Sequence, residues 1–193
     1  SGGTLIKVTG AHFRASTHAK CRFGSEDVKA TYLSPSSLQC LAPASSVGVV
    51  LVRVTMNGVD YSKDTLQFQF NSFVQVISVS PRGGFVAGGT EIEITTKHLR
   101  RGSYALCNFG TAGVVNATYE ARNLLKCMSP PSATTMNQYA TLEISTNGQD
   151  FTTDGVRFHY QLPAVVTTVT PHNGDITGGT VIHVYGRNFH DSD

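Results

Sequence analysis

The sequence contains no tryptophan, no long apolar run and no block of like charge. The last two absences each argue against a class of protein. No stretch reaches the roughly 18 to 20 apolar residues that a membrane-spanning helix needs. The 15 Lys and Arg residues and the 13 Asp and Glu residues are spread along the chain, which disfavours nucleic acid and anionic membranes as partners. What remains is rich in Gly, Thr, Ser and Val, and this composition favours strands joined by tight turns. We therefore expect an all-β fold.

Landmark residues recur along the chain, and this internal repeat sets the domain organisation. The triplet Gly-Gly-Thr begins at Gly2, Gly88 and Gly178, which are 86 and 90 residues apart. Other landmarks keep the same order in the first two copies: Cys21-Arg-Phe-Gly matches Cys107-Asn-Phe-Gly, Cys40-Leu-Ala-Pro matches Cys127-Met-Ser-Pro, and Asn57-Gly matches Asn147-Gly. A repeat of about 90 residues is close to the size of a seven-strand sandwich.

The repeat predicts three domains, with both chain ends inside a domain. Residues 1–71 form a domain without its opening strand, 72–161 a complete domain, and 162–193 the start of a third. We interpret the chain as an excerpt of a longer array, whose short connectors predict a stiff rod. A competing hypothesis is that the C-terminal strands complete the open N-terminal domain of a neighbouring copy, because an unpaired sandwich edge recruits a strand.

Apolar and polar residues alternate in the segments expected to be strands. After the first Gly-Gly-Thr, Ile6 and Val8 face one way and Lys7 the other, which is typical of a half-buried strand. The same parity places all four cysteines on inward faces. Asn57-Gly58 and Asn147-Gly148 are dipeptides typical of type I′ hairpins, so we expect tight turns there.

The four cysteines fall into two pairs at matching places, and we expect disulfides Cys21–Cys40 and Cys107–Cys127. Closing a loop of about 20 residues stabilises a domain by roughly 3 kcal/mol in the chain-entropy account. Because such bonds persist outside the cytosol, an extracellular or lumenal protein is expected. The alternative is four buried free thiols in an intracellular protein. Zinc is disfavoured because Cys-x-x-Cys is absent and no His lies at ligand spacing.

Asn116-Ala-Thr is the only N-glycosylation sequon in the chain. Val115, Ala117 and Tyr119 take the buried parity of their strand, so Asn116 is expected to point to solvent. If the protein is secreted, Asn116 is therefore a candidate glycan site. A chain of this length also often contains one sequon by chance.

No motif for catalysis or for binding a cofactor is present, and we expect neither an enzyme nor a cofactor. Gly-x-Ser-x-Gly, His-Glu-x-x-His and phosphate-cradling glycine loops are all missing from the sequence. Asp60 with Asp64 and Asp150 with Asp154 recur beside the Asn-Gly dipeptides and could suggest calcium. An Asp next to such a turn more often binds its own backbone, so no metal is predicted.

A series of motifs resembles the IPT/TIG family of immunoglobulin-like domains. The series is a Pro-x-x-Gly opening, Gly-Gly-Thr, an alternating apolar strand and a Gly-x-x-Phe ending, which here read Pro171-His-Asn-Gly174, Gly178-Gly-Thr180, Val181 to Tyr185 and Gly186-Arg-Asn-Phe189. The second unit departs from the ending with Thr96-Lys-His-Leu99. The resemblance covers essentially the whole chain and implies tandem Ig-like β-sandwiches. Family members include extracellular ectodomains, transcription factors and accessory domains of carbohydrate-active enzymes, and the cysteine pairs look most like the long extracellular arrays.

The expected function is non-enzymatic. We expect a structural or adhesive segment of an extracellular rod, cell-surface ectodomain or filament, whose partners are other proteins or further copies of itself. Neither nucleic acid nor membrane contact is predicted for this segment. The alternatives are a ligand-binding receptor ectodomain of the plexin kind and, with less support, an accessory carbohydrate-binding module or a DNA-binding TIG domain. Fold-level analogy alone does not decide among them.

Overall fold

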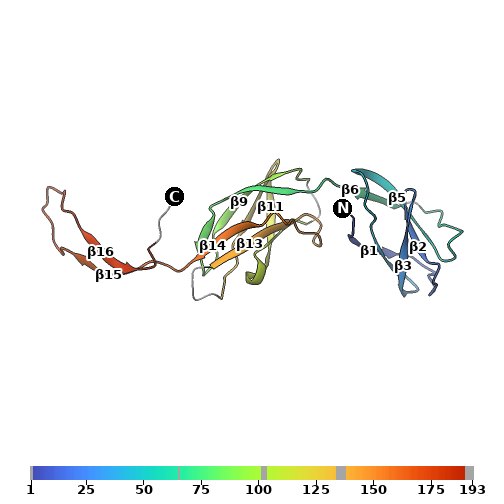
Figure 1. The fold of residues 1–193 in the computed structure, drawn as a ribbon, viewed down its shortest axis with the longest axis horizontal. Helices are drawn as coiled ribbons and strands as arrows, with labels where there is room; N and C mark the ends of the chain where they lie inside the picture. The colour runs from blue at the N-terminus through green and yellow to red at the C-terminus, as the bar shows by residue number, and fades with distance from the viewer. Residues whose placement is uncertain (1, 65, 101–103, 134–137, 190–193) are drawn as a thin grey trace. The chain divides into compact units, whose positions relative to one another are not determined.

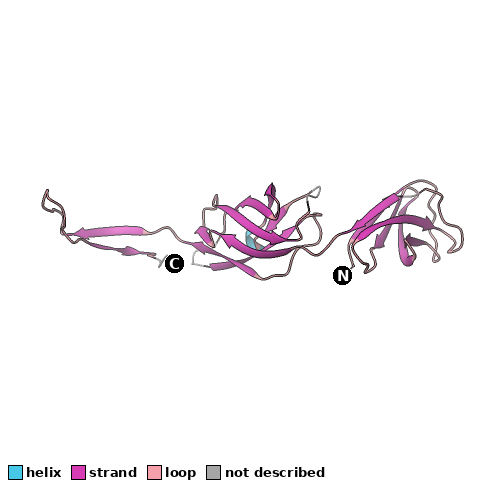
Figure 2. Ribbon diagram, turned by 90° about the horizontal axis from the view of Figure 1, so that it is seen from above, coloured by secondary structure: helices cyan, strands magenta, loops and turns pink. Residues whose placement is uncertain are grey.

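The computed structural model describes residues 2–64, 66–100, 104–133 and 138–189. Contacts within the chain divide it into two units, Ser1–Phe73 and Val74–Asp193. Figure 1 traces the strands of each unit, and Figure 2 shows that strand dominates the regular structure. Among the described residues the one helical element is a single 3-10 turn, η1 (Gly110–Ala112). The all-β prediction is confirmed, and no helix in this part of the chain is long and apolar enough to cross a membrane.

Unit 1 is a six-stranded antiparallel structure. Its strands are β1 (Leu5–Thr9), β2 (Lys20–Phe23), β3 (Glu26–Ser34), β4 (Ser37–Leu41), β5 (Gly48–Thr55) and β6 (Leu66–Phe70). They pair in the order β1-β4-β3-β2-β5-β6. The long strand β3 pairs with β2 through its first half and with β4 through its second half, so it passes from one layer of the sandwich to the other.

Unit 2 repeats this arrangement and adds a strand at each end of the order. Its strands are β7 (Gln75–Ser80), β8 (Gly83–Phe85), β9 (Glu91–Lys97), β10 (Leu106–Asn108), β11 (Val114–Ala121), β12 (Leu124–Met128), β13 (Gln138–Ser145) and β14 (Val156–Gln161). The order is β7-β9-β12-β11-β10-β13-β14-β8. Strand β11 is the counterpart of β3, because it pairs first with β10 and then with β12. The pairing of β14 with β8 is parallel.

The remaining pair of strands forms an antiparallel hairpin. Strand β15 (Val165–Thr170) pairs with β16 (His183–Arg187), with Val169 opposite Val184. In unit 2 the matching register places Val79 opposite Ile94, in the β7–β9 pair. The hairpin therefore repeats the first two long strands of the complete unit.

Three aromatic rings pack edge to face in the core of each sandwich. In unit 1, Phe68 lies 5.5 Å from Phe23 and 5.0 Å from Phe70, measured between ring centroids. In unit 2, Phe158 lies 5.5 Å from Phe109 and 5.1 Å from Tyr160. Edge-to-face contacts at this separation are favourable beyond the apolar area they bury. The repeat seen in the sequence is therefore a repeat of one core.

Candidate functional site

Each sandwich contains a buried disulfide between its two layers. Cys21 on β2 is joined to Cys40 on β4 with a Cα–Cα distance of 6.4 Å. Cys107 on β10 is joined to Cys127 on β12 at 6.7 Å. All four cysteines are at most 4% exposed, as the alternation predicted. Because β2 and β4 are separated by β3, and β10 and β12 by β11, each bond crosses the core and ties one layer to the other.

The sequon asparagine lies on an outward position of β11. Asn116 is exposed, whereas Val115 and Ala117 on either side of it are half-buried. Its cross-strand partner is Leu106 on β10. The side chain thus points away from the core, on a regular strand.

The two Asn-Gly loops are built by side-chain capping, and the prediction of type I′ turns is wrong. A type I′ turn needs positive φ at both central residues. Gly58 has a φ of 77° but Asn57 is not among the residues with positive φ, and the same holds for Gly148 and Asn147. Instead Asn57 Oδ1 accepts hydrogen bonds from the N–H groups of Val59 and Asp60, at 3.0 and 2.9 Å. The asparagine side chain replaces the backbone turn, as Asx turns do.

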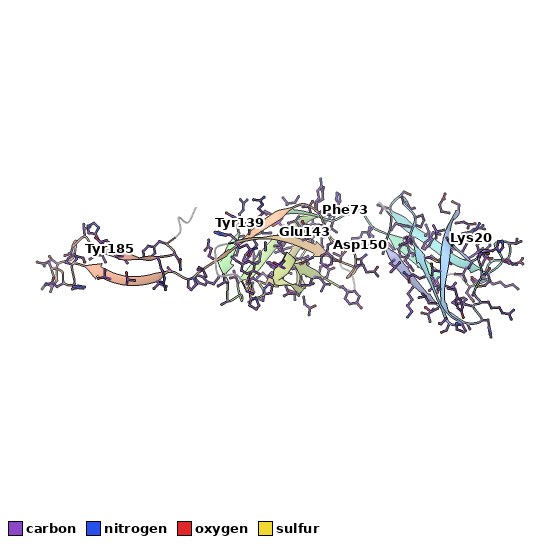
Figure 3. The ribbon with its side chains drawn as sticks, turned by 60° about the horizontal axis from the view of Figure 1, so that its bottom comes forward. Lys20, Phe73, Tyr139, Glu143, Asp150 and Tyr185 are labelled. Carbon is purple, nitrogen blue, oxygen red and sulfur yellow. A yellow bond between two sulfur atoms is a disulfide. The ribbon has the colours of Figure 1, made fainter. Side chains whose placement is uncertain are left out.

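The aspartates beside these loops have structural partners. The Asp60 carboxylate accepts from Asn57 Nδ2 at 2.8 Å, and Asp150 accepts from Asn147 Nδ2 at 2.7 Å. Figure 3 shows the side chains of these loops, with Asp150 labelled. Across the described residues, no group of three or more His, Cys, Asp and Glu side chains could hold a metal ion.

Asp154 fastens the first strand of unit 2. Its Oδ2 atom accepts a hydrogen bond from the backbone N–H of Val76 on β7 at 2.7 Å. Glu143 on β13 accepts hydrogen bonds from the Asp154 N–H at 3.2 Å and from the Gly155 N–H at 2.9 Å, which fixes the loop that carries Asp154. In unit 2 the second aspartate of this motif, Asp154, therefore holds β7 in place.

A cluster of charged and aromatic side chains lies on the surface of unit 1. Arg22 donates to both oxygens of Asp27, at 2.7 and 3.2 Å, and its guanidinium lies 3.7 Å from the ring centroid of Tyr61. The Tyr61 hydroxyl donates to Asp27 at 2.7 Å. Hydrogen bonds from Arg22 and then Tyr61 lower the pKa of Asp27 to about 2.

Sequence reasoning missed this surface cluster. Arg22 and Asp27 occupy directly opposite positions on β2 and β3, so the pairing of opposite charges was a usable signal. The contact of Tyr61 with Asp27 could not be predicted, because Tyr61 lies in a loop 34 residues further along the chain. In unit 2, Asn108 stands where Arg22 stands in unit 1, so the cluster is not repeated.

A different aromatic surface lies on unit 2. Tyr139 on β13 is 59% exposed, and its ring stacks on His159 of β14 with a centroid distance of 4.5 Å. Figure 3 labels Tyr139. Arg157 lies 5.8 Å from the centre of the same ring. In unit 1 the residues at the positions of Tyr139 and His159 are Val49 and Gln69, so the outward faces of the two sandwiches differ in chemistry.

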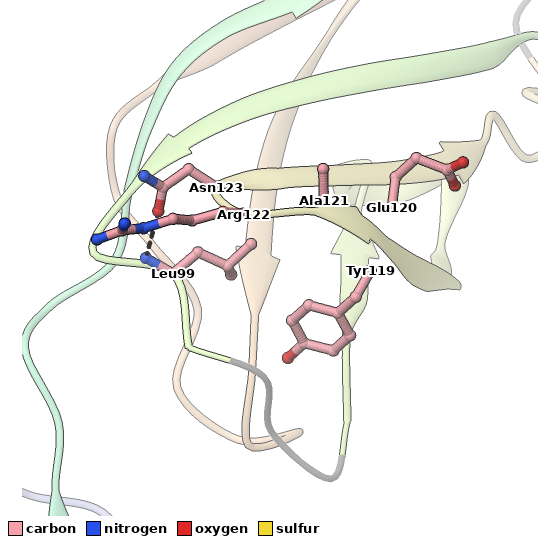
Figure 4. A pocket seen from close by; sticks show the side chains of 6 residues that line it. All are labelled: Leu99, Tyr119, Glu120, Ala121, Arg122 and Asn123. Carbon is pink, nitrogen blue, oxygen red and sulfur yellow. Dashed lines mark hydrogen bonds between the residues drawn. The ribbon is translucent and has the colours of Figure 1, made fainter.

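A shallow pocket of about 380 Å³ lies beside the turn between β11 and β12. Its described lining is Leu99, Tyr119, Glu120, Ala121, Arg122 and Asn123, drawn in Figure 4. Asn123 Oδ1 accepts a hydrogen bond from the Leu99 N–H at 3.2 Å, so the turn is fixed to the end of β9. This lining contains no paired nucleophile and base, and it supports no reaction class.

His12 and His98 lie in turns and have a shared backbone role. Both have a φ of 62°, and so does Asn188 at the matching place after β16. Positive φ is uncommon outside glycine, and Asn and His are among the residues that adopt it most readily. The turn is therefore kept in unit 2, although Thr96 and Leu99 replace the Gly and Phe of its motif.

Comparisons with known proteins agree with this architecture. The family described as IPT/TIG domain matches residues 1–70 and 75–160. Fibrocystin-L of Mus musculus is 24% identical over 98% of this chain, and Fibrocystin-L of Homo sapiens is 22% identical over 97%. The chain spans only 4% of the length of either relative. Among solved structures, the full extracellular region of plexin A4 has a TM-score of 0.59 and 17% identity, over 97% of this chain and 16% of that one.

Proposed function

Since the chain belongs to the IPT/TIG domain family, we propose that it is a non-enzymatic segment of an extracellular rod, filament or cell-surface ectodomain that acts through contacts between proteins. The observation that carries the proposal is the disulfide across the core of each sandwich. Two such bonds at matching places favour an oxidising compartment, because cytosolic thiols are kept reduced. The relation to the extracellular region of plexin A4 supports the same location.

The two sandwiches share their core but differ on their outward faces, and this difference supports a role in contacts with other proteins. The aromatic core and the disulfide are repeated in the two sandwiches, whereas the surface contacts of Arg22 and Tyr139 are not. Unit 1 presents Arg22 stacked on Tyr61, and unit 2 presents Tyr139 stacked on His159. Arg and Tyr are enriched among the residues that dominate binding energy at protein interfaces. Two faces of different chemistry on one scaffold suit two different partners.

We also propose the domain limits and the modification that go with this role. The limits are residues 1–71, 72–161 and 162–193, and the boundary between contact units after Phe73 supports the first of them. The match of the β15–β16 hairpin to β7 and β9 supports the third domain. Asn116 carries an N-glycan, supported by its exposed place on β11.

The second candidate is a ligand-binding receptor ectodomain, which the structural likeness to plexin A4 favours. The two candidates share location and fold and differ in the partner. In the first, the contacts join segments of an assembly. In the second, an external protein ligand binds to a domain of the same receptor.

The location is tested on cells that produce the full-length protein. An antibody against this segment should stain intact cells or detect the protein in their medium. Peptide mapping without reduction should recover Cys21 linked to Cys40 and Cys107 linked to Cys127. Staining that requires permeabilised cells, together with four free thiols, would refute the extracellular proposal and reopen the intracellular branch of the family. A marker of the cytosol, stained in parallel, controls for leaky cells.

A further inference from the structure

Four cations lie on one outward face of the sheet in unit 1. Lys20 and Arg22 are on β2, Lys29 is on β3 and Arg53 is on β5, and these three strands are neighbours in the order β3-β2-β5. Figure 3 labels Lys20. Residues two apart on a strand share a face, and neighbouring strands lie about 4.8 Å apart. The four side chains therefore form one positive surface, which we call the basic face.

The basic face places like charges directly opposite each other. Lys20 is the cross-strand partner of Lys29, and Arg22 is the cross-strand partner of Arg53. Like charges in directly opposite positions destabilise a sheet. Asp27 forms ion pairs with Lys20 and Arg22. Lys29 and Arg53 are exposed, and neither has an ion pair with a residue that the structure describes. The repulsion is therefore only partly offset within unit 1.

The sandwich does not require these charges, because unit 2 has none of them. Leu106 and Asn116 stand where unit 1 has the two lysines. Asn108 and Glu143 stand where it has the two arginines. The same pairing of strands and the same core are therefore built without the basic face. Cations that repel each other and that the fold can omit are explained by a ligand of opposite charge.

The ligand is expected to carry several negative groups. Residues 1–73 contain seven Lys and Arg against four Asp and Glu, whereas residues 74–193 contain eight against nine. The excess of positive charge thus belongs to unit 1. Two hydrogen bonds to Asp27 and stacking on Tyr61 orient the Arg22 guanidinium before a ligand binds. Arginine and lysine bind sulfate and carboxylate groups through charge-assisted hydrogen bonds.

We propose that the basic face binds a sulfated polysaccharide of the cell surface or the matrix, which rests on the extracellular location proposed above. Sulfates of successive sugar units bind to the lysine pair and to the arginine pair. A linear chain with repeated negative groups matches cations spread over three strands of a sheet, whereas a single small anion would contact only one pair. The bound charges also relieve the repulsion within each pair, so binding recovers part of the stability that the basic face costs.

The first test is the binding of heparin to the whole chain at about 150 mM salt, where weak attraction between distant charges is screened. K20Q/K29Q should weaken binding about tenfold or more. It should also lower the slope of log K against log salt by about 2, because two cations no longer release counterions from the polyanion. K7Q/K97Q is the matched control, since it removes two exposed lysines on β1 and β9, and it should bind as the parent chain does. No binding by the parent chain, or an equal loss in the control, would overturn the proposal.

The second test separates lost binding from lost folding. Arg53→Glu gives unit 1 the residue that unit 2 has at this place and puts an opposite charge across from Arg22. The midpoint of unfolding in urea should therefore stay the same or rise, while the affinity for heparin falls about tenfold or more. A lower midpoint would contradict the repulsion on which the proposal depends, and an unchanged affinity would contradict the site.

The third test identifies the class of polyanion. Hyaluronan, which carries carboxylates but no sulfates, should bind more weakly than heparin, and equal binding would contradict recognition of sulfate. Vesicles of phosphatidylserine and phosphatidylcholine represent a lipid surface. Binding to these vesicles that K20Q/K29Q abolishes, without binding to heparin, would overturn the proposal and assign the basic face to a membrane. All three tests use the purified chain, so they can fail while staining of intact cells still supports the extracellular location. Staining found only inside cells would refute that location and leave the heparin measurements unchanged.

Discussion

At the residue scale, the Gly-x-x-Phe ending of the repeat brings its glycine close to its phenylalanine ring. A Cβ placed on Gly10 would lie 2.6 Å from the Phe13 ring. On Gly186 it would lie 2.7 Å from the Phe189 ring and closer still to the backbone oxygen of Val165. Unit 2 has Thr96 and Leu99 at these two places. The smaller Leu99 leaves room for Thr96, whose hydroxyl donates to the Asn123 carbonyl at 3.0 Å. The two positions therefore compensate each other in volume.

Gly10→Thr should consequently destabilise unit 1. The added side chain meets the Phe13 ring, and overpacking of this kind costs about 1–3 kcal/mol. The double variant G10T/F13L reproduces the pair found in unit 2 and should lose less stability than the sum of the two single changes. Unfolding in urea, followed by the fluorescence of tyrosine, measures the three variants. Strict additivity would show that the two positions do not interact.

Asp27 makes the stability of unit 1 depend on acid pH. Its pKa in the folded state is about 2, below the ordinary value of 3.8, because Arg22 and Tyr61 donate hydrogen bonds to the carboxylate. A lowered folded-state pKa adds stability above the unfolded pKa, and that stability is lost as the pH falls from about 4 to 2. The contribution is at most about 1 kcal/mol, since solvent screens the pair.

Asp27→Asn should thus destabilise unit 1 at pH 7 and have little effect at pH 2. The difference in unfolding free energy between Asp27→Asn and the parent chain, measured across that range, checks the expectation. Glu26→Gln, at the exposed neighbour on β3, serves as the control for a change of charge. A difference that stays constant with pH would mean that the Asp27 carboxylate is not the source.

At the element scale, period-two alternation made most strands and the inward cysteines predictable, because each strand buries one face. Two features had no such signal. Strands β3 and β11 each change partner along their length, which depends on the closure of the sandwich and not on local sequence. Strand β8 contains Gly83 and Gly84 and has no alternation, so its parallel pairing with β14 could not be inferred. The type of the turn at Asn57 was predicted wrongly, because hydrogen bonds to the Asn57 side chain replace the geometry of a backbone turn.

Removing a cross-layer disulfide should destabilise its own unit. C107A/C127A opens a loop of about 20 residues in unit 2, and C21A/C40A does the same in unit 1, each at a cost of roughly 3 kcal/mol. Both cysteines of a pair are changed together so that no unpaired thiol remains. Calorimetry of the two variants should show a lower midpoint for one unit in each case. An unchanged midpoint after either change would show that the bond contributes little to the folded state.

The tether of β7 gives a comparison between the two units. Asp154→Ala removes the acceptor of the Val76 N–H and should destabilise unit 2 by about 1–3 kcal/mol, with faster hydrogen exchange at Val76. Asp64→Ala is the same change in unit 1, where no described strand pairs with the outer edge of β1, and it should cost far less. Equal effects would mean that the aspartate stabilises its loop and not the strand.

At the scale of the whole molecule, the two sandwiches share their core and differ in their surface. The sequence repeat could reveal the shared part, because burial restricts the residues that pack around the disulfide. It could not reveal the Tyr61 cluster or the Tyr139 stack, since outward positions are free to vary between copies. A surface that varies on a fixed core is also where a glycan can be added or moved without a change of fold.

The glycan proposed at Asn116 can be tested against a matched site in the other sandwich. Asn116→Gln should abolish a shift in gel mobility caused by glycosidase treatment of the chain secreted from eukaryotic cells. Lys29 stands at the place of Asn116 in unit 1 and is followed by Ala30-Thr31, as Asn116 is by Ala117-Thr118. Lys29→Asn therefore creates the same sequon on the matching exposed strand position and should add a second glycan. A chain modified only in the Lys29→Asn form would show that the strand position is accessible and that Asn116 itself is not used.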